Sequence, residues 1–197
     1  MSITINHQTN DISSTSGSLT IDGAAIGGGG GALEFISKTT ISSSITSVEL
    51  TGLTSHTNYL VVFNIGMGTG ARFMLQLSED NGLTYKTNGC FYTYQKAAVS
   101  SVTVGEVSNA GTSMYLDGSG SVSQSVNGTA LLMRCNQTTD FSALFDFSQN
   151  LNDSKRYINK TVVGVTSQST KIDAIKLHTT YGNFEDGAVL LYGLKES

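Results

Sequence analysis

Side chains that commonly carry out chemistry are sparse in this chain and do not form a recognised motif. The three histidines, His7, His56 and His178, lie far apart, and no two of them have the short spacing of metal ligands. Cys90 and Cys135 each lie within an apolar, strand-like run, and their spacing matches neither a zinc motif nor a redox motif. The sequence therefore predicts two buried free thiols, no metal site and no cofactor.

Paired carboxylates could cleave a glycosidic bond if they stood about 5–9 Å apart on the floor of a cleft. Most of the 15 acidic residues lie in turn-like contexts such as Glu79-Asp80. Asp146 and Asp173 differ, because each interrupts an apolar segment, ALFDF and KIDAI. No G-x-S-x-G nucleophile motif accompanies them. We predict that the protein is not an enzyme and has no catalytic residues.

Five consecutive glycines resemble a phosphate-binding loop at first sight: Gly27, Gly28, Gly29, Gly30 and Gly31. Such a loop needs a Lys and a Ser or Thr at the start of a following helix, whereas ALEFIS, a strand-like segment, follows here. A glycine run without those partners is a flexible linker. We therefore interpret it as a hinge that ends an N-terminal arm, residues 1–31, and precedes one main domain, residues 32–197.

The composition favours strands and excludes several classes of protein. Hydrophobic residues make up 39% and charged residues only 13%, and the polar remainder is rich in Ser, Thr, Asn and Gly, which suit turns and solvated strand faces. A net charge of −4 without a basic run argues against nucleic-acid binding. No segment approaches the roughly 20 apolar residues of a membrane span, and the first residues lack a secretion signal.

The main domain has the pattern of an all-β fold. From Leu33 onward, short strand-like segments recur every ten to fifteen residues, with turn residues and no amphipathic helix between them. Two segments that are apolar on both faces, YLVVF at 59–63 and AVLLY at 188–192, predict central strands. The expected fold is an antiparallel β-sandwich, jelly-roll-like, with an extended N-terminal arm.

The segment RFMLQLSEDNG shows the alternation expected of a half-buried strand. Phe73, Leu75 and Leu77 fall on one face, and the intervening residues from Arg72 to Gln76 fall on the other. Asn and Gly tolerate positive φ, so Asp80-Asn81-Gly82 predicts a tight hairpin turn after this strand.

Apolar residues of the arm alternate with polar ones in short bursts. Two short strands are marginal in water without a third strand or another surface to cover them. We therefore predict that the arm is an assembly anchor, and that these residues form its contact: Ile3, Ile5, Ile12, Leu19 and Ile21.

Tyr92 and Tyr94 belong to the densest aromatic cluster, FYTY, and share one face of a strand. Exposed tyrosines are common anchors of interfaces and can stack on sugars, so the pair is a candidate receptor or interface contact. The alternative is that both side chains cover the edge of a sheet.

The opening segment TINHQTNDISSTSGSLTIDGAAIGGGG resembles the N-terminal segments of structural proteins of tailed bacteriophages. The segments LEFISKTTISSSITSVELTGL, YLVVFNIGM, RFMLQLSEDNGLTY, NGTALLMRC and KIDAIKLHTTYGNFEDGAVLLYGLK are similar to a family of phage virion proteins found in tail fibres and on capsid surfaces. The resemblance covers nearly the whole chain but rests on turn and strand signatures, so it transfers no active-site residue.

The resemblance implies a virion protein that is made in the host cytoplasm and forms a homotrimer. In the first hypothesis it is a fibre or spike, anchored to other virion proteins through residues 1–31 and attached to a host cell-surface glycan through its sandwich. In the second it is a capsid decoration protein that stabilises the head. A free carbohydrate-binding module is the third.

Overall fold

The computed structural model divides into two compact units, Met1–Ala32 and Leu33–Ser197. In the first unit it describes the backbone of residues 3–6, 11–14, 20–21 and 24–25. It also describes residue 32, the last of the first unit. In the second unit it describes residues 33–98, 101–110, 113–116, 125–150, 156–165, 168 and 170–195, with the side chains of 108–110 and 156 outside this description.

The first unit contains two separate two-stranded sheets. Strand β1 (Ile3–Asn6) pairs antiparallel with β2 (Asp11–Ser14), which sets Ile5 opposite Ile12. Strand β3 (Thr20–Ile21) pairs antiparallel with β4 (Ala24–Ala25). The predicted anchor residue Leu19 and the predicted hinge, Gly27, Gly28, Gly29, Gly30 and Gly31, lie outside the described residues.

The second unit is an antiparallel β-sandwich, as predicted, and its described residues include no helix. In spatial order, the larger sheet contains eight strands: β10 (Ser101–Ala110), β9 (Cys90–Ala98), β14 (Arg156–Val165), β13 (Ser142–Asn150), β12 (Ser125–Met133), β7 (Tyr59–Met67), β16 (Phe184–Leu194) and β5 (Leu33–Ile41). The smaller sheet contains four: β11 (Met114–Tyr115), β8 (Phe73–Ser78), β15 (Ala174–Thr179) and β6 (Ser47–Leu50).

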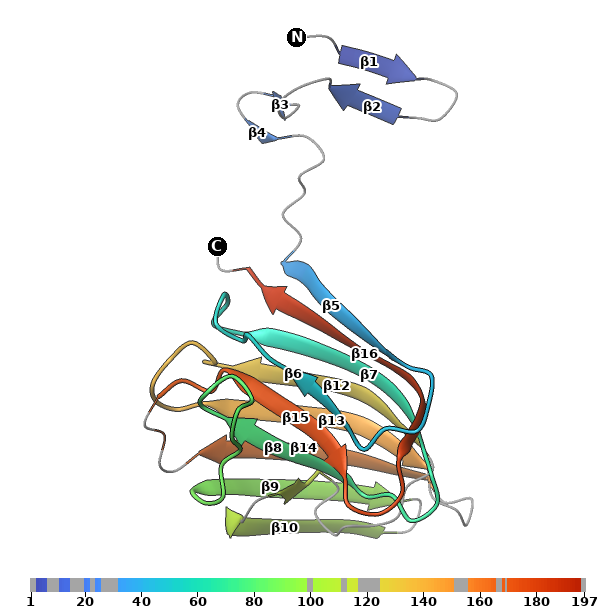
Figure 1. The fold of residues 1–197 in the computed structure, drawn as a ribbon, viewed down its shortest axis with the longest axis vertical. Helices are drawn as coiled ribbons and strands as arrows, with labels where there is room; N and C mark the ends of the chain where they lie inside the picture. Colours follow the sequence, from blue (N-terminus) through green and yellow to red (C-terminus); the bar gives the residue numbers. More distant parts are fainter. Residues whose placement is uncertain are drawn as a thin grey trace. The chain divides into compact units, whose positions relative to one another are not determined.

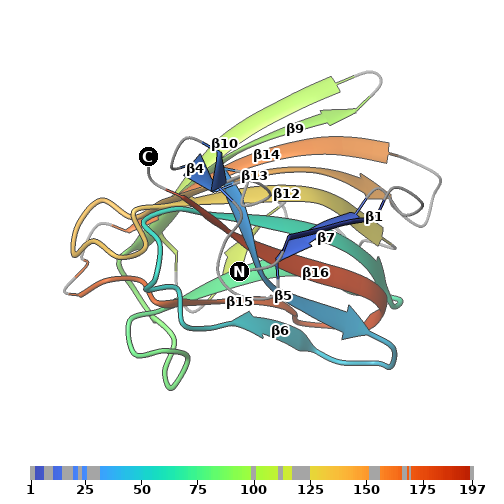
Figure 2. The ribbon, with the colours of Figure 1, turned by 90° about the horizontal axis from the view of Figure 1, so that it is seen from above.

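The chain passes repeatedly from one sheet to the other. Among the described strands of the second unit, only β9–β10 and the run β12–β13–β14 are neighbours both in sequence and in the sheet. Figure 1 shows β6, β15 and β8 lying across the larger sheet, and Figure 2, seen from above, shows the larger sheet as a curved layer on one side of β6 and β15. The two segments predicted to be central strands are central: β7 lies between β12 and β16, and β16 lies between β7 and β5.

The turn after β8 has the predicted backbone but not the predicted role. Asn81 and Gly82 both have positive φ, at 58° and 86°. They do not close a hairpin, because β8 pairs with β15 and β11, and the next strand, β9, belongs to the other sheet. Both edges of β8 are occupied by other strands. The chain after the turn therefore folds back to a hydrogen bond from Lys86 N to Leu77 O, 2.8 Å long, and then crosses to the other sheet.

The core between the sheets is built around phenylalanines from both of them. Phe73 of β8 lies 5.3 Å from Phe63 of β7 and 5.6 Å from Phe147 of β13, measured between ring centroids. Phe184 of β16 lies 6.3 Å from Phe73 on another side. Such tilted and edge-on pairs contribute about 0.5–1.5 kcal/mol each beyond the burial of their area. Phe73 therefore fastens the smaller sheet to the larger one.

Gly128 makes room for this cluster from within β12. It lies directly opposite Phe63 on one side and Phe147 on the other. A Cβ atom added at Gly128 would collide with the Cβ of Phe147 and with the backbone oxygen of Asp146. Glycine normally weakens a strand, so its presence here reflects the close approach of the β13 backbone at Asp146 and Phe147.

Replacing Gly128 with Ala should destabilise the sandwich by about 1–3 kcal/mol, because an overpacked core must shift side chains or backbone. The midpoint of urea unfolding, followed by circular dichroism, measures this change. Thr129→Ala, at the exposed neighbouring position, is the matched control and should leave the midpoint nearly unchanged. Equal midpoints for both variants would contradict the packing role of Gly128.

Candidate functional site

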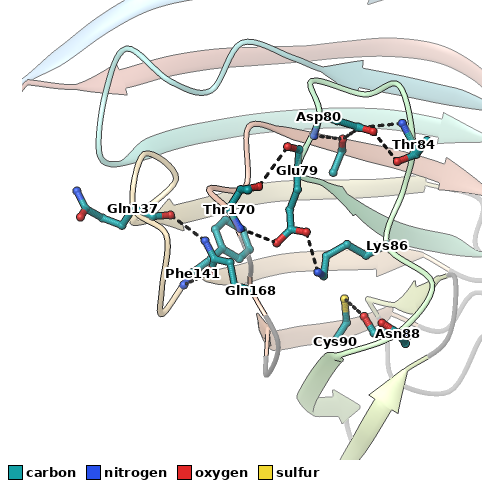
Figure 3. A network of polar contacts seen from close by, with 11 residues as sticks. Glu79, Asp80, Thr84, Lys86, Asn88, Cys90, Gln137, Phe141, Gln168 and Thr170 are labelled. Atoms are coloured by element: carbon teal, nitrogen blue, oxygen red, sulfur yellow. Dashed lines mark hydrogen bonds and ion pairs between the residues drawn. The ribbon is translucent and has the colours of Figure 1, made fainter.

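The segment between β8 and β9 forms one wall of a polar hollow with a volume of about 320 Å³ (Figure 3). Its other wall comes from the segment before β15. The hollow is lined by Glu79, Asp80, Thr84, Tyr85, Lys86, Thr87, Asn88 and Thr170. Carboxylates, an ammonium group and hydroxyls thus meet at one place, and their hydrogen bonds decide what they can do.

Asp80 is used to build the turn. Its carboxylate accepts hydrogen bonds from Thr84 Oγ1 at 2.6 Å, Thr84 N at 2.8 Å and Ser78 Oγ at 2.7 Å. These bonds, chiefly the one from the Thr84 hydroxyl, hold the pKa of Asp80 below its ordinary value. An ionised carboxylate that accepts several local hydrogen bonds stabilises the turn and is poorly placed to accept a proton from a substrate.

Glu79 ties the segment to the rest of the sandwich. Its Oε2 atom lies 3.1 Å from Lys86 Nζ, its Oε1 atom accepts a hydrogen bond from Thr170 N at 3.5 Å, and its backbone oxygen accepts one from Thr170 Oγ1 at 3.3 Å. Figure 3 shows these contacts bridging the two walls of the hollow. The arrangement is a structural clasp, and the two carboxylates of the hollow already have partners.

The same segment covers part of the outer face of the smaller sheet. The Tyr85 ring lies over Lys176 of β15, with Nζ 4.6 Å from the ring centroid, and Lys176 Nζ lies 3.1 Å from Glu49 Oε1. Burial, reinforced by the negative charge of Glu49, raises the pKa of Tyr85 to about 12. Tyr85 is therefore a neutral, packed ring at ordinary pH.

A second group on this outer face is more accessible. The guanidinium of Arg72 lies between two rings, 5.9 Å from the centroid of Tyr115 and 5.5 Å from that of Tyr181. Tyr181 is 69% exposed. Two buried nitrogens of this face, Arg72 Nε and His178 Nε2, have no hydrogen-bond partner among the described residues. Burial lowers the pKa of His178, so its ring is neutral. Arg72, Tyr115 and Tyr181 form what we call the cation–aromatic cluster, and it is the best candidate for contact with a ligand.

The predicted tyrosine contact is corrected by the packing. Tyr92 is 3% exposed and belongs to the core, so it cannot serve as a surface contact. Tyr94 is partly buried against that core, with its ring 6.4 Å from Tyr92 and in contact with Gly105. Both rings face the interior because β9 turns this face of the strand inward.

The two unusual aspartates do not work together. Asp146 lies on the outer face of β13 and pairs with Lys160 at 3.2 Å. Asp173 lies before β15 and accepts a hydrogen bond from Asn81 N at 2.7 Å. Each aspartate therefore has its own structural contact, which explains why it stands within an apolar segment.

The histidines and cysteines likewise have separate surroundings. His56 contacts Glu34, Nε2 to Oε2 3.4 Å, and His7 lies outside the described residues. Cys90 and Cys135 are free and buried, as predicted, and burial raises the pKa of Cys135 to about 12. Within the described part of the chain, no three His, Cys, Asp or Glu side chains are grouped to hold a metal ion.

Sequence reasoning missed the cation–aromatic cluster. Its three residues are separated by more than forty positions, and no motif links them. They meet because β8 pairs with both β11 and β15, which brings Tyr115 and the turn at Tyr181 to the two sides of Arg72.

The comparisons with known proteins add no family. No protein-family model, curated protein sequence or solved structure gives a significant match to this chain. No helix long and apolar enough to cross a membrane occurs among the described residues. The functional proposal therefore depends on the sequence resemblance stated above and on the geometry of this chain.

Asp80→Ala should loosen the turn at residues 79–88, because it removes the acceptor for Thr84 and Ser78. Amide hydrogen exchange of this segment should become faster, with the core strands unchanged, and Asp80→Asn should have a smaller effect. Since the folded-state pKa of Asp80 is lowered from 3.8, its contribution is complete above that pH and is lost as the pH falls through the lower folded-state value. Unchanged exchange in the alanine variant would show that the hydrogen bonds of Asp80 do not order the turn.

Cys135 should make the fold sensitive to alkali. Its pKa rises from 9.0 to about 12 on folding, so the thiol favours the folded state below pH 9, and this contribution is lost as the pH rises toward 12. The free energy of unfolding, measured by urea titration at several pH values, should therefore fall less steeply with pH in Cys135→Ala than in the parent protein. Parallel pH profiles for the two proteins would show that folding does not raise the pKa of the Cys135 thiol.

Proposed function

We propose that the protein is a structural component of a bacteriophage virion, a homotrimeric fibre or spike subunit that is anchored by its N-terminal unit and displays the sandwich toward a host-surface glycan. Its partners are other copies of the chain, other virion proteins and that glycan. The proposal joins the resemblance of the sequence to phage virion proteins with the physical character of the two units.

The observation that carries the proposal is the isolated state of the β1–β2 hairpin. Among the described residues of their unit, these two four-residue strands pair with each other alone, and the second sheet there, β3–β4, has strands of two residues. A two-stranded sheet of this size is at best marginally stable in water. Addition of such strands to a sheet or surface of another protein would supply the missing cover.

The cation–aromatic cluster supports the displayed role of the sandwich. Tyr181 presents a largely exposed ring, and Arg72 next to it carries a permanent positive charge. An aromatic face beside a guanidinium suits a sugar that carries a carboxylate or sulfate group. In the proposed function this cluster replaces Tyr92 and Tyr94 as the receptor contact.

Deletion of residues 1–31 tests the anchor. The truncated protein should keep the circular dichroism spectrum and cooperative unfolding of a β domain, because the core residues lie in the second unit. It should fail to join the particle, which quantitative mass spectrometry of purified virions measures. Full occupancy without the arm, or an unfolded truncated protein, would refute the division into anchor and displayed domain. Density for the chain on heads, and none at tails, in a reconstruction would favour a decoration protein instead.

Tyr181→Ala tests the receptor contact. On an array of neutral and acidic glycans the parent protein should prefer acidic sugars, and the variant should lose about tenfold or more in affinity, as removal of a central aromatic anchor commonly does. Leu83→Ala is the matched control, because Leu83 is 85% exposed on the segment after β8 and outside the cluster. Equal binding by both variants would exclude Tyr181 from the contact.

A further inference from the structure

The larger sheet has an outer face, turned away from the smaller sheet, that is unusually apolar. On β7 the residues facing the core, such as Val61 and Phe63, are almost completely buried, whereas the alternate residues Leu60 and Val62 are only partly covered. The same alternation runs along the neighbouring strands. Polar residues would be expected at these alternate positions if the face were permanently in water.

The apolar side chains of this face form one continuous row across six strands. The printed strand pairings set them directly opposite one another, in the order Val162, Leu144, Leu131, Leu60, Tyr192 and Phe35. Val162 is 40% exposed, Leu144 38% and Phe35 57%, so the row is accessible. Val62 and Leu190, directly opposite each other, lie two residues further along and widen it. We call these eight residues the apolar row.

The size of this face matches that of a stable protein interface. With strands about 4.8 Å apart and residues about 3.3 Å apart, eight strands of nine or so residues offer a face of about 1,000 Å². A standard interface buries about 800 Å² on each partner. The face is therefore large enough to serve as an interface on its own.

Two exposed charges of opposite sign lie at the two ends of the face, and Asp186 of β16 adds a further exposed negative charge next to Gly66 of β7. At the β5 end, Lys38 lies directly opposite Leu190 and is exposed. At the β10 end, Glu106 is exposed opposite Thr93, which is itself opposite Val162. The Lys160–Asp146 pair between them is neutral as a unit. A second copy of the same face, turned so that its β10 end meets the β5 end of the first, sets Glu106 against Lys38.

We propose that the outer face of the larger sheet binds a second copy of this chain, with the β5 side of one copy against the β9–β10 side of the other and the apolar rows in contact. Because both copies use the same face, the contact is isologous and closes as a two-fold pair. The inference therefore goes beyond the proposed homotrimer and names a separate surface through which two copies associate. The Lys38–Glu106 pair sets which ends meet, and the apolar row supplies the affinity.

A charge-reversal cycle on the full chain tests the orientation. The parent protein should sediment as an oligomer in analytical ultracentrifugation. Lys38→Glu or Glu106→Lys alone places like charges together and should weaken association about tenfold or more, whereas the double variant should return to within about threefold of the parent. A monomeric parent at every concentration, unaffected single variants or an unrescued double variant would overturn the proposal.

A second pair of variants tests the apolar row. Leu144→Asp should weaken association about tenfold or more, and Val162→Thr, which keeps the shape of the side chain, should have a smaller effect in the same direction. Leu83→Asp is the matched control, because it places the same charge at an exposed leucine away from the face. Thermal unfolding of each variant verifies the fold. Equal effects of Leu144→Asp and Leu83→Asp would exclude the row from the interface.

These outcomes are separable from those of the proposed function. A chain that joins virions through its arm but stays monomeric in solution would keep the virion role and lose this interface. A chain that associates through the face but is absent from virions would keep the interface and lose the virion role.

Discussion

An eight-stranded sheet has two faces, and the four-stranded sheet packs on only one of them. The two faces of the larger sheet therefore have different surroundings. On the covered side, Phe73 of the smaller sheet inserts among the rings of Phe63, Phe147 and Phe184, and Gly128 yields its side-chain space to them. On the uncovered side, the apolar row continues across six strands with nothing from the second unit's described residues packed over it. The core thus accounts for the apolar residues on one face of this sheet, and the proposed contact with a second copy would cover those on the other.

The smaller sheet packs on the larger one with its inner face, and its outer face would be open to water. The segment after β8 lies over part of it, and Tyr85 on Lys176 is the contact that brings it there. Asp80 and Glu79, which are adjacent in the sequence, serve this purpose. Asp80 stiffens the turn, and Glu79 holds it to Thr170. Both carboxylates accept local hydrogen bonds. The acidic and hydroxyl groups that line the hollow are therefore explained by the structure of the turn.

Three surfaces with different physical characters remain for interaction. Strands β1 and β2 have outer edges that no other described strand pairs with, the outer face of the larger sheet offers apolar area, and the cation–aromatic cluster offers a charged, exposed aromatic contact. Strand addition, apolar burial and recognition of an anionic ligand are distinct kinds of binding. A chain that anchors, associates and displays would use one of them for each task.

The sequence by itself determined the class of fold and nearly every strand, since alternation and turn residues depend only on neighbours along the chain. Strand β5 coincides with the predicted segment LEFISKTTI, and the positive φ values of Asn81 and Gly82 follow from local sterics. Only the tertiary structure decided which strands pair and therefore which face of each strand meets the core. Asn81-Gly82 fails to close a hairpin because β15 occupies the edge of β8, and Tyr92 is buried because β9 turns that face inward. The cation–aromatic cluster and the apolar row are products of pairing between distant strands, so no local pattern could reveal them.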